Sequence, residues 1–225
     1  DSLGTWHGEL SGGARISNGR LILNGEDAFV RTKALPKDLS DKTLEVWVAL
    51  SRLEQRGGGA MAIESDDGKV FDGIVYGERQ PRKWTAGSNN FERTRDLDAP
   101  EETDSLPALL HIAIVYRADN SVSVYRNGEL HGQSYTPKNV RQTFKANTAR
   151  VLFGNRHTGA AKGFLAGEIE QASLYDRALS AAEVAASLTA SGLQVSQPEI
   201  LAALTAEESC GVRSGCGRSI ATARR

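Results

Sequence analysis

Two glutamates, Glu168 and Glu170, have a spacing close to that of a pair of catalytic carboxylates. Residues two apart in an extended strand point to the same face, with Cα atoms about 6 to 7 Å apart. Retaining glycosidases place two carboxyl groups about 5 to 5.5 Å apart. The spacing is therefore compatible with a glycoside hydrolase or lyase. The alternative is a structural role, in which both carboxylates form surface salt bridges.

A second group with ligand-binding chemistry lies at positions 78–91, where Trp84 and Phe91 are interleaved with charged and amide side chains. A Trp ring can stack on the apolar C–H surface of a sugar, while amide, carboxylate and guanidinium groups hydrogen-bond its hydroxyls. In the alternative interpretation, Trp84 packs inward and the polar residues cover a long hairpin. The candidate ligand-binding residues here are Glu78, Arg79, Arg82, Trp84, Asn89 and Asn90.

A glycine-rich loop at positions 156–163 supplies two more candidate ligand-binding residues, Arg156 and His157. Its glycines indicate mobility or an awkward turn. Loops on a rigid scaffold often carry binding residues, but the same composition suits a plain connection between strands.

Carboxylates crowd the segment from Asp96 to Asp104. Hard cations such as Ca²⁺ prefer oxygen ligands, so this segment is a candidate calcium site. No EF-hand pattern fixes the ligand positions, and a solvated loop neutralised by Arg93 and Arg95 is the simpler alternative. The candidate metal ligands are Asp96, Asp98, Glu101 and Glu102, and no other cofactor is expected.

Motifs of other enzyme classes are missing from the sequence. It has no Gly-x-Ser-x-Gly elbow, no His-Glu-x-x-His pair and no phosphate-binding loop. The histidines are scattered without metal-ligand spacing. His111, on a predicted strand, is expected to be a hydrogen-bonded structural residue.

The elements that must position these residues are predicted to be short β-strands. Positions 43–50 alternate in polarity, so one face of that strand belongs to the core. Asn18-Gly19 and Asn127-Gly128 suit the positive φ angles of tight hairpin turns, and positions 109–135 form a three-stranded meander. The pattern predicts an all-β, two-sheet antiparallel sandwich.

Helical signals occur only near the C-terminus. Ser180 and Glu183 form a capping box, and Leu179 with Val184 forms a hydrophobic staple. We expect a sandwich domain at 1–192, a short helix within 193–209 and a disordered, Arg-rich tail at 210–225. Whether Cys210 and Cys216 pair is left open.

Charge and hydropathy argue against nucleic-acid binding and against membrane insertion. The formal net charge is −1, and the four arginines of the tail leave −5 on the remaining residues. A mildly acidic body argues against nucleic acid as a partner. The sequence contains no apolar run of the roughly 18 to 20 residues that membrane insertion needs.

The stretches H-I-A-I-V-Y at 111–116 and V-S-V-Y-R-N-G at 122–128 resemble the central hairpin of laminin-G-like domains. The stretch F-L-A-G-E-I-E-Q-A-S-L-Y-D-R-A-L-S at 164–180 resembles the closing strand of that family. The resemblance implies a concanavalin A-like jelly roll with one or two short C-terminal helices. Glucanases of this fold have Glu-x-Asp-x-x-Glu, whereas Glu168-Ile169-Glu170 lacks the third carboxylate.

Three further segments, at 56–59, 77–84 and 100–103, resemble laminin-G-like domains of large secreted bacterial proteins that also carry cytochrome-c-like domains. That resemblance implies an extracytoplasmic, secreted or periplasmic setting. We therefore expect a non-catalytic binding module for a carbohydrate or a protein partner. The alternatives are a structural domain that docks on neighbouring domains of a parent protein and, less favoured, a hydrolase or lyase.

Overall fold

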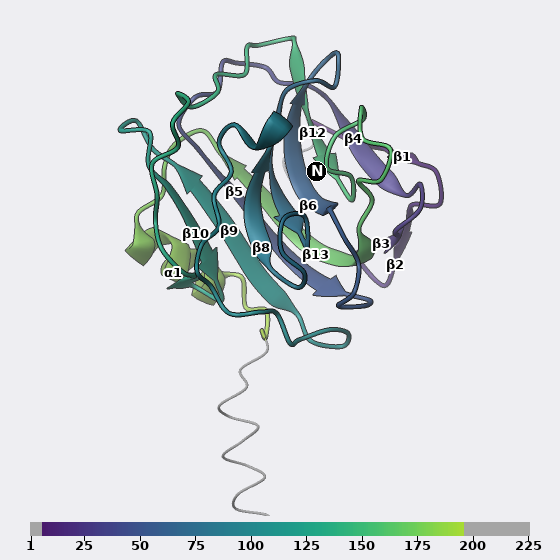
Figure 1. The fold of residues 1–225 in the computed structure, drawn as a ribbon. Helices are drawn as coiled ribbons and strands as arrows, with labels where there is room; N and C mark the ends of the chain where they lie inside the picture. Colours follow the sequence, from purple (N-terminus) through teal and green to yellow (C-terminus); the bar gives the residue numbers. More distant parts are fainter. Residues whose placement is uncertain (1–5, 196–225) are drawn as a thin grey trace, which may run out of the picture. The chain divides into compact units, whose positions relative to one another are not determined.

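A computed structural model describes residues 6–195, which form two antiparallel β-sheets packed face to face (Figure 1). This confirms the predicted β-sandwich. The six-stranded sheet has the order β1 (Gly8–Ser11), β4 (Phe29–Ala34), β12 (Ala149–Phe153), β6 (Gly58–Ser65), β7 (Phe71–Tyr76) and β8 (Trp84–Ser88).

The seven-stranded sheet covers the other side of the core. Its strands are β11 (Glu129–Leu130), β10 (Val122–Arg126), β9 (Leu110–Tyr116), β5 (Lys42–Leu50), β13 (Ala166–Tyr175), β3 (Arg20–Asn24) and β2 (Arg15–Ser17), in that order.

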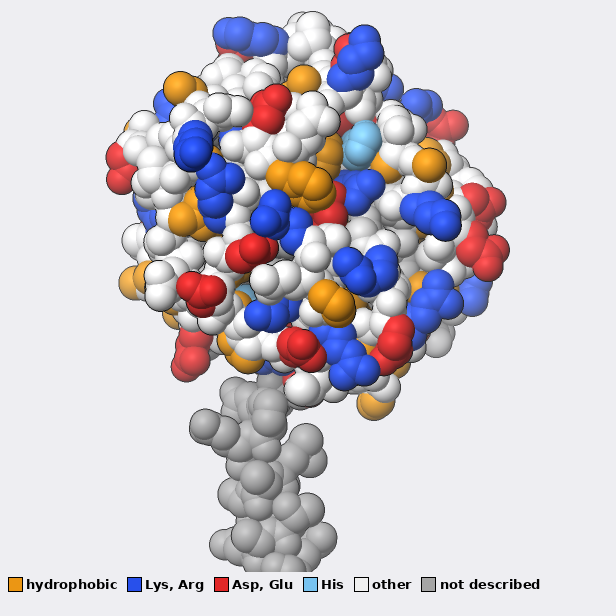
Figure 2. Space-filling model, viewed as in Figure 1, with side chains coloured by type: hydrophobic (Ala, Val, Ile, Leu, Met, Phe, Trp, Pro, Cys, Tyr) orange, Lys and Arg blue, Asp and Glu red, His pale blue; other side chains and the backbone are white. Residues whose placement is uncertain are grey.

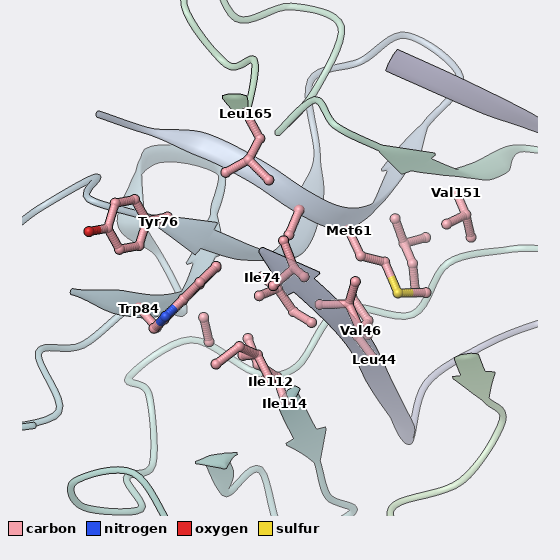
Figure 3. Close-up of a cluster of buried hydrophobic side chains, with 14 of the residues drawn as sticks. Leu44, Val46, Met61, Ile74, Tyr76, Trp84, Ile112, Ile114, Val151 and Leu165 are labelled. Carbon is pink, nitrogen blue, oxygen red and sulfur yellow. The ribbon is translucent and has the colours of Figure 1, made fainter. Parts of the chain in front are cut away.

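The core lies between the sheets because alternate side chains of each strand point inward. Leu44 and Val46 of β5 meet Met61 of β6 and Ile74 of β7, and all four are buried (Figure 3). Burying each such side chain contributes about 1.5 to 3 kcal/mol.

Strand β5 is buried on both faces, whereas its alternating sequence predicted one core face. The second face, which includes Trp47, is covered by Leu193 and Val195. Next to it, buried Glu45 accepts hydrogen bonds from Tyr175 and Ser187. The C-terminal end of the described chain therefore forms a third layer over part of this sheet.

The polar contact between Glu45 and His111 lies in the same region. The His111 Nε2 and Glu45 Oε1 atoms are 2.8 Å apart, and both side chains are fully buried. His111 also lies against Trp47, with ring centroids 4.7 Å apart. These contacts agree with the structural role expected for His111.

Both predicted Asn-Gly turns have the backbone that was expected. Asn18 and Gly19 have φ values of 50° and 81°, as do Asn127 and Gly128 at 51° and 81°. The third strand of the meander, β11, is shorter than predicted. The chain turns away at Gly132, where a Cβ would lie 2.1 Å from the carbonyl oxygen of Leu97.

Helix α1 (Ala181–Ala190) begins as the sequence predicts. Ser180 and Glu183 make the reciprocal capping box, and Leu179 and Val184 share one apolar cluster. The second helix, the Arg-rich tail at 210–225 and both cysteines lie outside the described residues. In the part of the chain from 6 to 195, no helix is long and apolar enough to cross a membrane.

Three charged side chains are buried together inside the sandwich. Asp72 on β7 has one carboxylate oxygen 2.9 Å from Lys42 Nζ on β5 and the other 2.8 Å from Arg93 Nε. The Lys42 and Asp72 side chains have no solvent exposure, and that of Arg93 has 4%. Burial lowers the pKa of Lys42, and the Asp72 carboxylate opposes this shift. The cluster connects the two sheets across the core.

We expect Asp72→Asn to lower the free energy of unfolding by about 3 to 5 kcal/mol, because it leaves buried Lys42 without its counterion and removes one of the two carboxylates that pair with Arg93. Urea denaturation of the wild type and the variant measures this difference. The matched control is Asp176→Asn, which removes an exposed partner of Lys37 and should leave stability close to wild type. An equal loss in both variants would contradict the role given to the cluster.

Candidate functional site

The outer face of the six-stranded sheet carries a hollow of about 220 Å³. Along β7, Ile74 and Tyr76 join the core, so the alternating Phe71 points to the opposite, outer face. We call this feature the sheet-face hollow. Its lining residues are Lys69, Phe71, Glu78, Ser88, Asn89, Asn90, Phe91, Arg156 and His157.

Two segments that the sequence analysis treated separately meet in the sheet-face hollow. Positions 78–91 contribute Glu78, Asn89 and Asn90, and the loop at 156–163 contributes Arg156 and His157. Five of the eight predicted ligand-binding residues therefore lie together. They are brought there by the loops that follow β7, β8 and β12.

The loop at 156–163 is fastened to the sheet. Thr158 donates two hydrogen bonds to the buried carboxylate of Glu64 on β6, from its backbone N at 2.7 Å and from Oγ1 at 2.9 Å. The chain can approach this closely because β6 begins with glycines: a Cβ on Gly59 would lie 2.4 Å from the Cα of Arg156. The loop therefore does more than connect two strands, since it forms one wall of the hollow.

His157 lies flat against Phe71, with ring centroids 4.6 Å apart and an angle of 13° between the rings. Its Nδ1 is 3.0 Å from the carbonyl oxygen of Gly68, which can only accept a hydrogen bond. Nδ1 therefore carries the hydrogen. Burial lowers the pKa of His157, with a contribution from Arg156, although the Gly68 contact opposes the shift.

Glu78 and Arg156 form an ion pair in the wall of the hollow, with Oε1 and Nη1 2.5 Å apart. Their side chains are 8% and 18% exposed. Burial raises the pKa of Glu78, and Arg156 partly opposes this. The other carboxylate oxygen, Oε2, and the Nε of Arg156 are buried and have no hydrogen-bond partner among the described residues.

A short 3₁₀ turn, η1 (Asn89–Phe91), forms the opposite wall. Asn90 and Phe91 have φ values of 50° and 55°, in the left-handed region that is uncommon for residues other than glycine. Arg93 holds the turn in place, because its Nη2 donates to Asn89 Oδ1 at 2.7 Å and to the Phe71 carbonyl at 3.1 Å. The buried charge cluster thus also positions this wall.

The interpretation of Trp84 as a surface for sugar stacking is wrong. Trp84 is 2% exposed, and its Nε1 donates to the buried Glu102 carboxylate at 3.0 Å. Its ring packs beside Tyr76, with centroids 5.0 Å apart (Figure 3). Positions 84–88 form strand β8, whose alternation turns Trp84 toward the core.

The other two predicted ligand-binding residues do not line the hollow. Arg79 pairs with Asp96 at 2.9 Å, and its guanidinium lies 5.3 Å from the centroid of the Phe91 ring. Arg82 pairs with Glu54 at 2.7 Å. Arg79 therefore supports the hollow from outside through Phe91, and Arg82 is separate from it.

Two of the four predicted calcium ligands pair with arginines. Asp96 forms an ion pair with Arg79, and the two carboxylate oxygens of Glu102 accept hydrogen bonds from Arg126 at 2.8 and 2.9 Å. Among the side chains from 6 to 195, no three His, Cys, Asp or Glu residues gather in the arrangement of metal ligands, and Asp96, Asp98, Glu101 and Glu102 are not brought together in that way. Arginines from other elements neutralise this segment.

Glu168 and Glu170 lie together on the seven-stranded sheet, and both bind the Arg20 guanidinium, with Glu168 at 3.0 Å. These contacts raise the pKa of Arg20. One guanidinium therefore bridges both carboxylates, with its Nη1 bound to Glu168 and its Nε to Glu170. The pair is a salt bridge, as the structural interpretation held.

Four lining residues are absent from the list of candidate ligand-binding residues: Lys69, Phe71, Ser88 and Phe91. Phe71 had a usable signal, because the alternation of positions 71–76 places it on the face opposite Ile74 and Tyr76. Ser88 and Phe91 belong to the segment at 78–91 that the sequence singled out, whereas Lys69, in the turn between β6 and β7, had no signal.

Charges over the surface drawn in Figure 2 are interspersed rather than gathered by sign. Basic and acidic side chains alternate there with uncharged ones. The pattern fits the near-zero formal charge of the chain. It does not favour a polyanion as the partner of that face.

Structural comparison finds the same fold in proteins of low sequence identity. Domain 4 of AbnA, an extracellular GH43 arabinanase from Geobacillus stearothermophilus seen with arabinotriose, has a TM-score of 0.63 at 18% identity, over 83% of this chain and 90% of that one. A SAP-like pentraxin from Limulus polyphemus has 0.58 at 16%, over 74% and 79%. The CBM40 of a Ruminococcus gnavus sialidase, bound to α2,3-sialyllactose, has 0.51 at 15%, over 67% and 83%.

Comparison with curated proteins finds no match. A family model, Laminin_G_3, described as the concanavalin A-like lectin/glucanases superfamily, matches residues 24–185. The match covers well over half of the chain and includes both walls of the sheet-face hollow. The chain therefore belongs to the concanavalin A-like lectin/glucanase superfamily.

Proposed function

We propose that this chain is a non-catalytic module that binds a saccharide in the sheet-face hollow. The observation that carries the proposal is the meeting of Glu78, Asn89, Asn90, Arg156 and His157 in one hollow on a sheet face. Carboxylate, amide, guanidinium and imidazole groups together hydrogen-bond hydroxyls in both directions. Phe91, 41% exposed at the rim, adds an apolar surface for C–H groups.

Comparison structures support a saccharide as the class of ligand but leave its charge open. The arabinanase domain was seen with arabinotriose, which is uncharged, and the CBM40 with sialyllactose, which carries a carboxylate. Fold alone does not establish function. The argument for this chain therefore depends on its own hollow.

We place the module outside the cytoplasm, within a larger secreted or periplasmic protein. The support is the family resemblance and the fact that the arabinanase domain is one part of an extracellular enzyme. The cytochrome-c-like domain that the sequence resemblance implies elsewhere in the parent protein belongs to this proposal.

A second candidate function is docking to a neighbouring protein domain. A hollow of about 580 Å³ opens between the two sheets and is lined mainly by apolar side chains, including Ile16, Leu21 and Met61. Ile16 is 61% exposed. Apolar surface of this kind often marks a protein contact.

For saccharide binding, we expect Asn90→Gly to weaken affinity about two- to tenfold, because one hydrogen bond contributes about 0.5 to 1.5 kcal/mol. Glycine keeps the left-handed backbone and removes only the amide. A glycan array identifies the ligand, and calorimetry measures its Kd. The matched control is Asn147→Gly, an exposed residue with φ of 61° that lies away from the hollow.

Binding unchanged in Asn90→Gly but weakened in Asn147→Gly would place the site elsewhere. A folded wild-type protein that binds nothing on the array would argue against saccharide binding altogether.

For the hydrolase alternative, we expect no release of reducing ends when the protein is incubated with the glycans that it binds. The Glu168→Gln and Glu170→Gln variants should bind them as the wild type does, since neither residue lines the sheet-face hollow. Product that appears with the wild type and is lost in either variant would restore the catalytic interpretation.

For docking, we expect the separately expressed adjoining segment of a parent protein to co-purify with the module, and Ile16→Ser to reduce that recovery. The exposed Val140 offers a control, Val140→Ser, of similar exposure at 77%. Equal recovery of the adjoining segment with both variants would show that the hollow between the two sheets is not the docking surface.

A further inference from the structure

Phe91 is an apolar side chain that the core of the fold does not use. It is 41% exposed, and it belongs to none of the apolar clusters formed by residues 6–195. It lines the sheet-face hollow, where the other exposed side chains, Lys69 and Asn90, are polar. Single exposed apolar residues are common on protein surfaces, so the case for a role of Phe91 depends on how the residue is held.

The backbone at Phe91 has an unfavourable conformation. Its φ is 55°, and that of the preceding Asn90 is 50°. Asparagine tolerates this left-handed region, whereas a bulky residue such as phenylalanine rarely adopts it. Strain of this kind persists only where neighbouring contacts enforce it, and it concentrates at ligand sites.

The contacts that enforce this turn do not involve the phenyl ring. The backbone N of Arg93 donates to Ser88 Oγ at 2.9 Å, and that of Thr94 donates to the Phe91 carbonyl at 3.3 Å. The Arg93 guanidinium binds Asn89 Oδ1. A glycine at position 91 would keep all three hydrogen bonds and adopt the positive φ freely. The turn therefore gives no structural reason for an aromatic residue at this position.

Arg79 covers one face of the Phe91 ring. Its guanidinium carbon lies 5.3 Å from the ring centroid, and its Nε pairs with Asp96 at 2.9 Å. Phe91 lines the sheet-face hollow and Arg79 does not, so the ring lies between Arg79 and the hollow. The face opposite Arg79 is therefore the one that a ligand can reach.

The size of the hollow limits what can lie on that face. Its volume is about 220 Å³, below the roughly 300 to 1,000 Å³ of pockets for drug-sized ligands. The hollow therefore has room for about one sugar ring. A pyranose chair with equatorial hydroxyls has C–H groups on its face and hydroxyls around its edge. Such a ring can place its face on Phe91 and its hydroxyls toward the polar lining residues.

We propose that Phe91 is the stacking surface of the sheet-face hollow, and that the hollow takes pyranosides with at least one face free of axial oxygens. The proposal rests on the saccharide-binding function proposed above and adds the class of sugar and the side chain that selects it. An axial oxygen on the stacked face holds the two rings apart. It also presses a hydroxyl against an apolar surface, where it loses its hydrogen bonds to water.

The first test is a nuclear magnetic resonance titration of the protein with methyl glycosides. The β-D-glucopyranoside, β-D-galactopyranoside and β-D-xylopyranoside each have a face without axial oxygens, whereas the α-D-mannopyranoside has an axial oxygen on both faces. We expect at least one of the first three to bind about fivefold or more tightly than the mannoside. Its C–H protons on the stacked face should shift upfield, in the ring current of Phe91.

The outcomes of this titration and of the glycan array separate the two proposals. A mannoside that binds as tightly as the other three, or binding limited to furanosides on the array, would overturn the sugar class and leave saccharide binding intact. Binding to no glycan at all would overturn the proposed function and the stacking surface with it.

The second test is Phe91→Gly, which keeps the left-handed backbone and removes the ring. We expect about three- to tenfold weaker binding of the tightest methyl glycoside, with a melting temperature no lower than that of the wild type. The matched control is Leu130→Ala, which trims a side chain that is 50% exposed on β11 and should leave binding unchanged. A lower melting temperature with unchanged binding would show that the ring serves the fold and would overturn the proposal.

The third test compares Phe91→Leu with Phe91→Trp, and it decides the matter even if Phe91→Gly does not fold. Leucine keeps an apolar side chain without a flat face, so we expect about three- to tenfold weaker binding and loss of the upfield shifts. Tryptophan keeps a flat ring and should bind at least as tightly as the wild type. Wild-type affinity in Phe91→Leu would exclude stacking on Phe91.

Discussion

The carboxylate of Asp72 is the constraint on which much of this structure depends. It lies on β7 inside the sandwich, where it meets Lys42 from the opposite sheet and Arg93 from the segment after β8. A buried charge without partners is costly, so the three side chains must be brought together. Their meeting fixes how the sheets face each other. Through the hydrogen bond from Arg93 to Asn89, it also fixes one wall of the sheet-face hollow.

The opposite wall is positioned by a second buried carboxylate, that of Glu64, which binds Thr158 on the outer face of the same sheet. Glycines at the start of β6 let the loop at 156–163 pass close to the strand. The result is a hollow whose walls are held by buried charge on both sides of the sheet. Walls held in this way suit the preformed recognition site that we propose.

The chemistry of the molecule points toward recognition rather than catalysis. The closely spaced strand carboxylates Glu168 and Glu170 are held by a single guanidinium and lie on the other sheet. In the hollow, the carboxylate of Glu78 is likewise paired, with Arg156. Paired charges lower the electrostatic field of a site and leave hydrogen-bond geometry to distinguish ligands.

The sequence by itself determined the two-sheet class, the Asn-Gly turns and the capped helix, because these depend on short-range alternation and backbone preference. It also named five of the residues that line the hollow. Tertiary structure alone decided that Glu78 and Arg156 form an ion pair and that Trp84 points into the core. It also decided that Asp96 and Glu102 form ion pairs with arginines. The reason is physical: each of these outcomes depends on which strands pair and which faces meet, and residues 78 and 156 come into contact only when the loops after β7 and β12 reach the same end of one sheet.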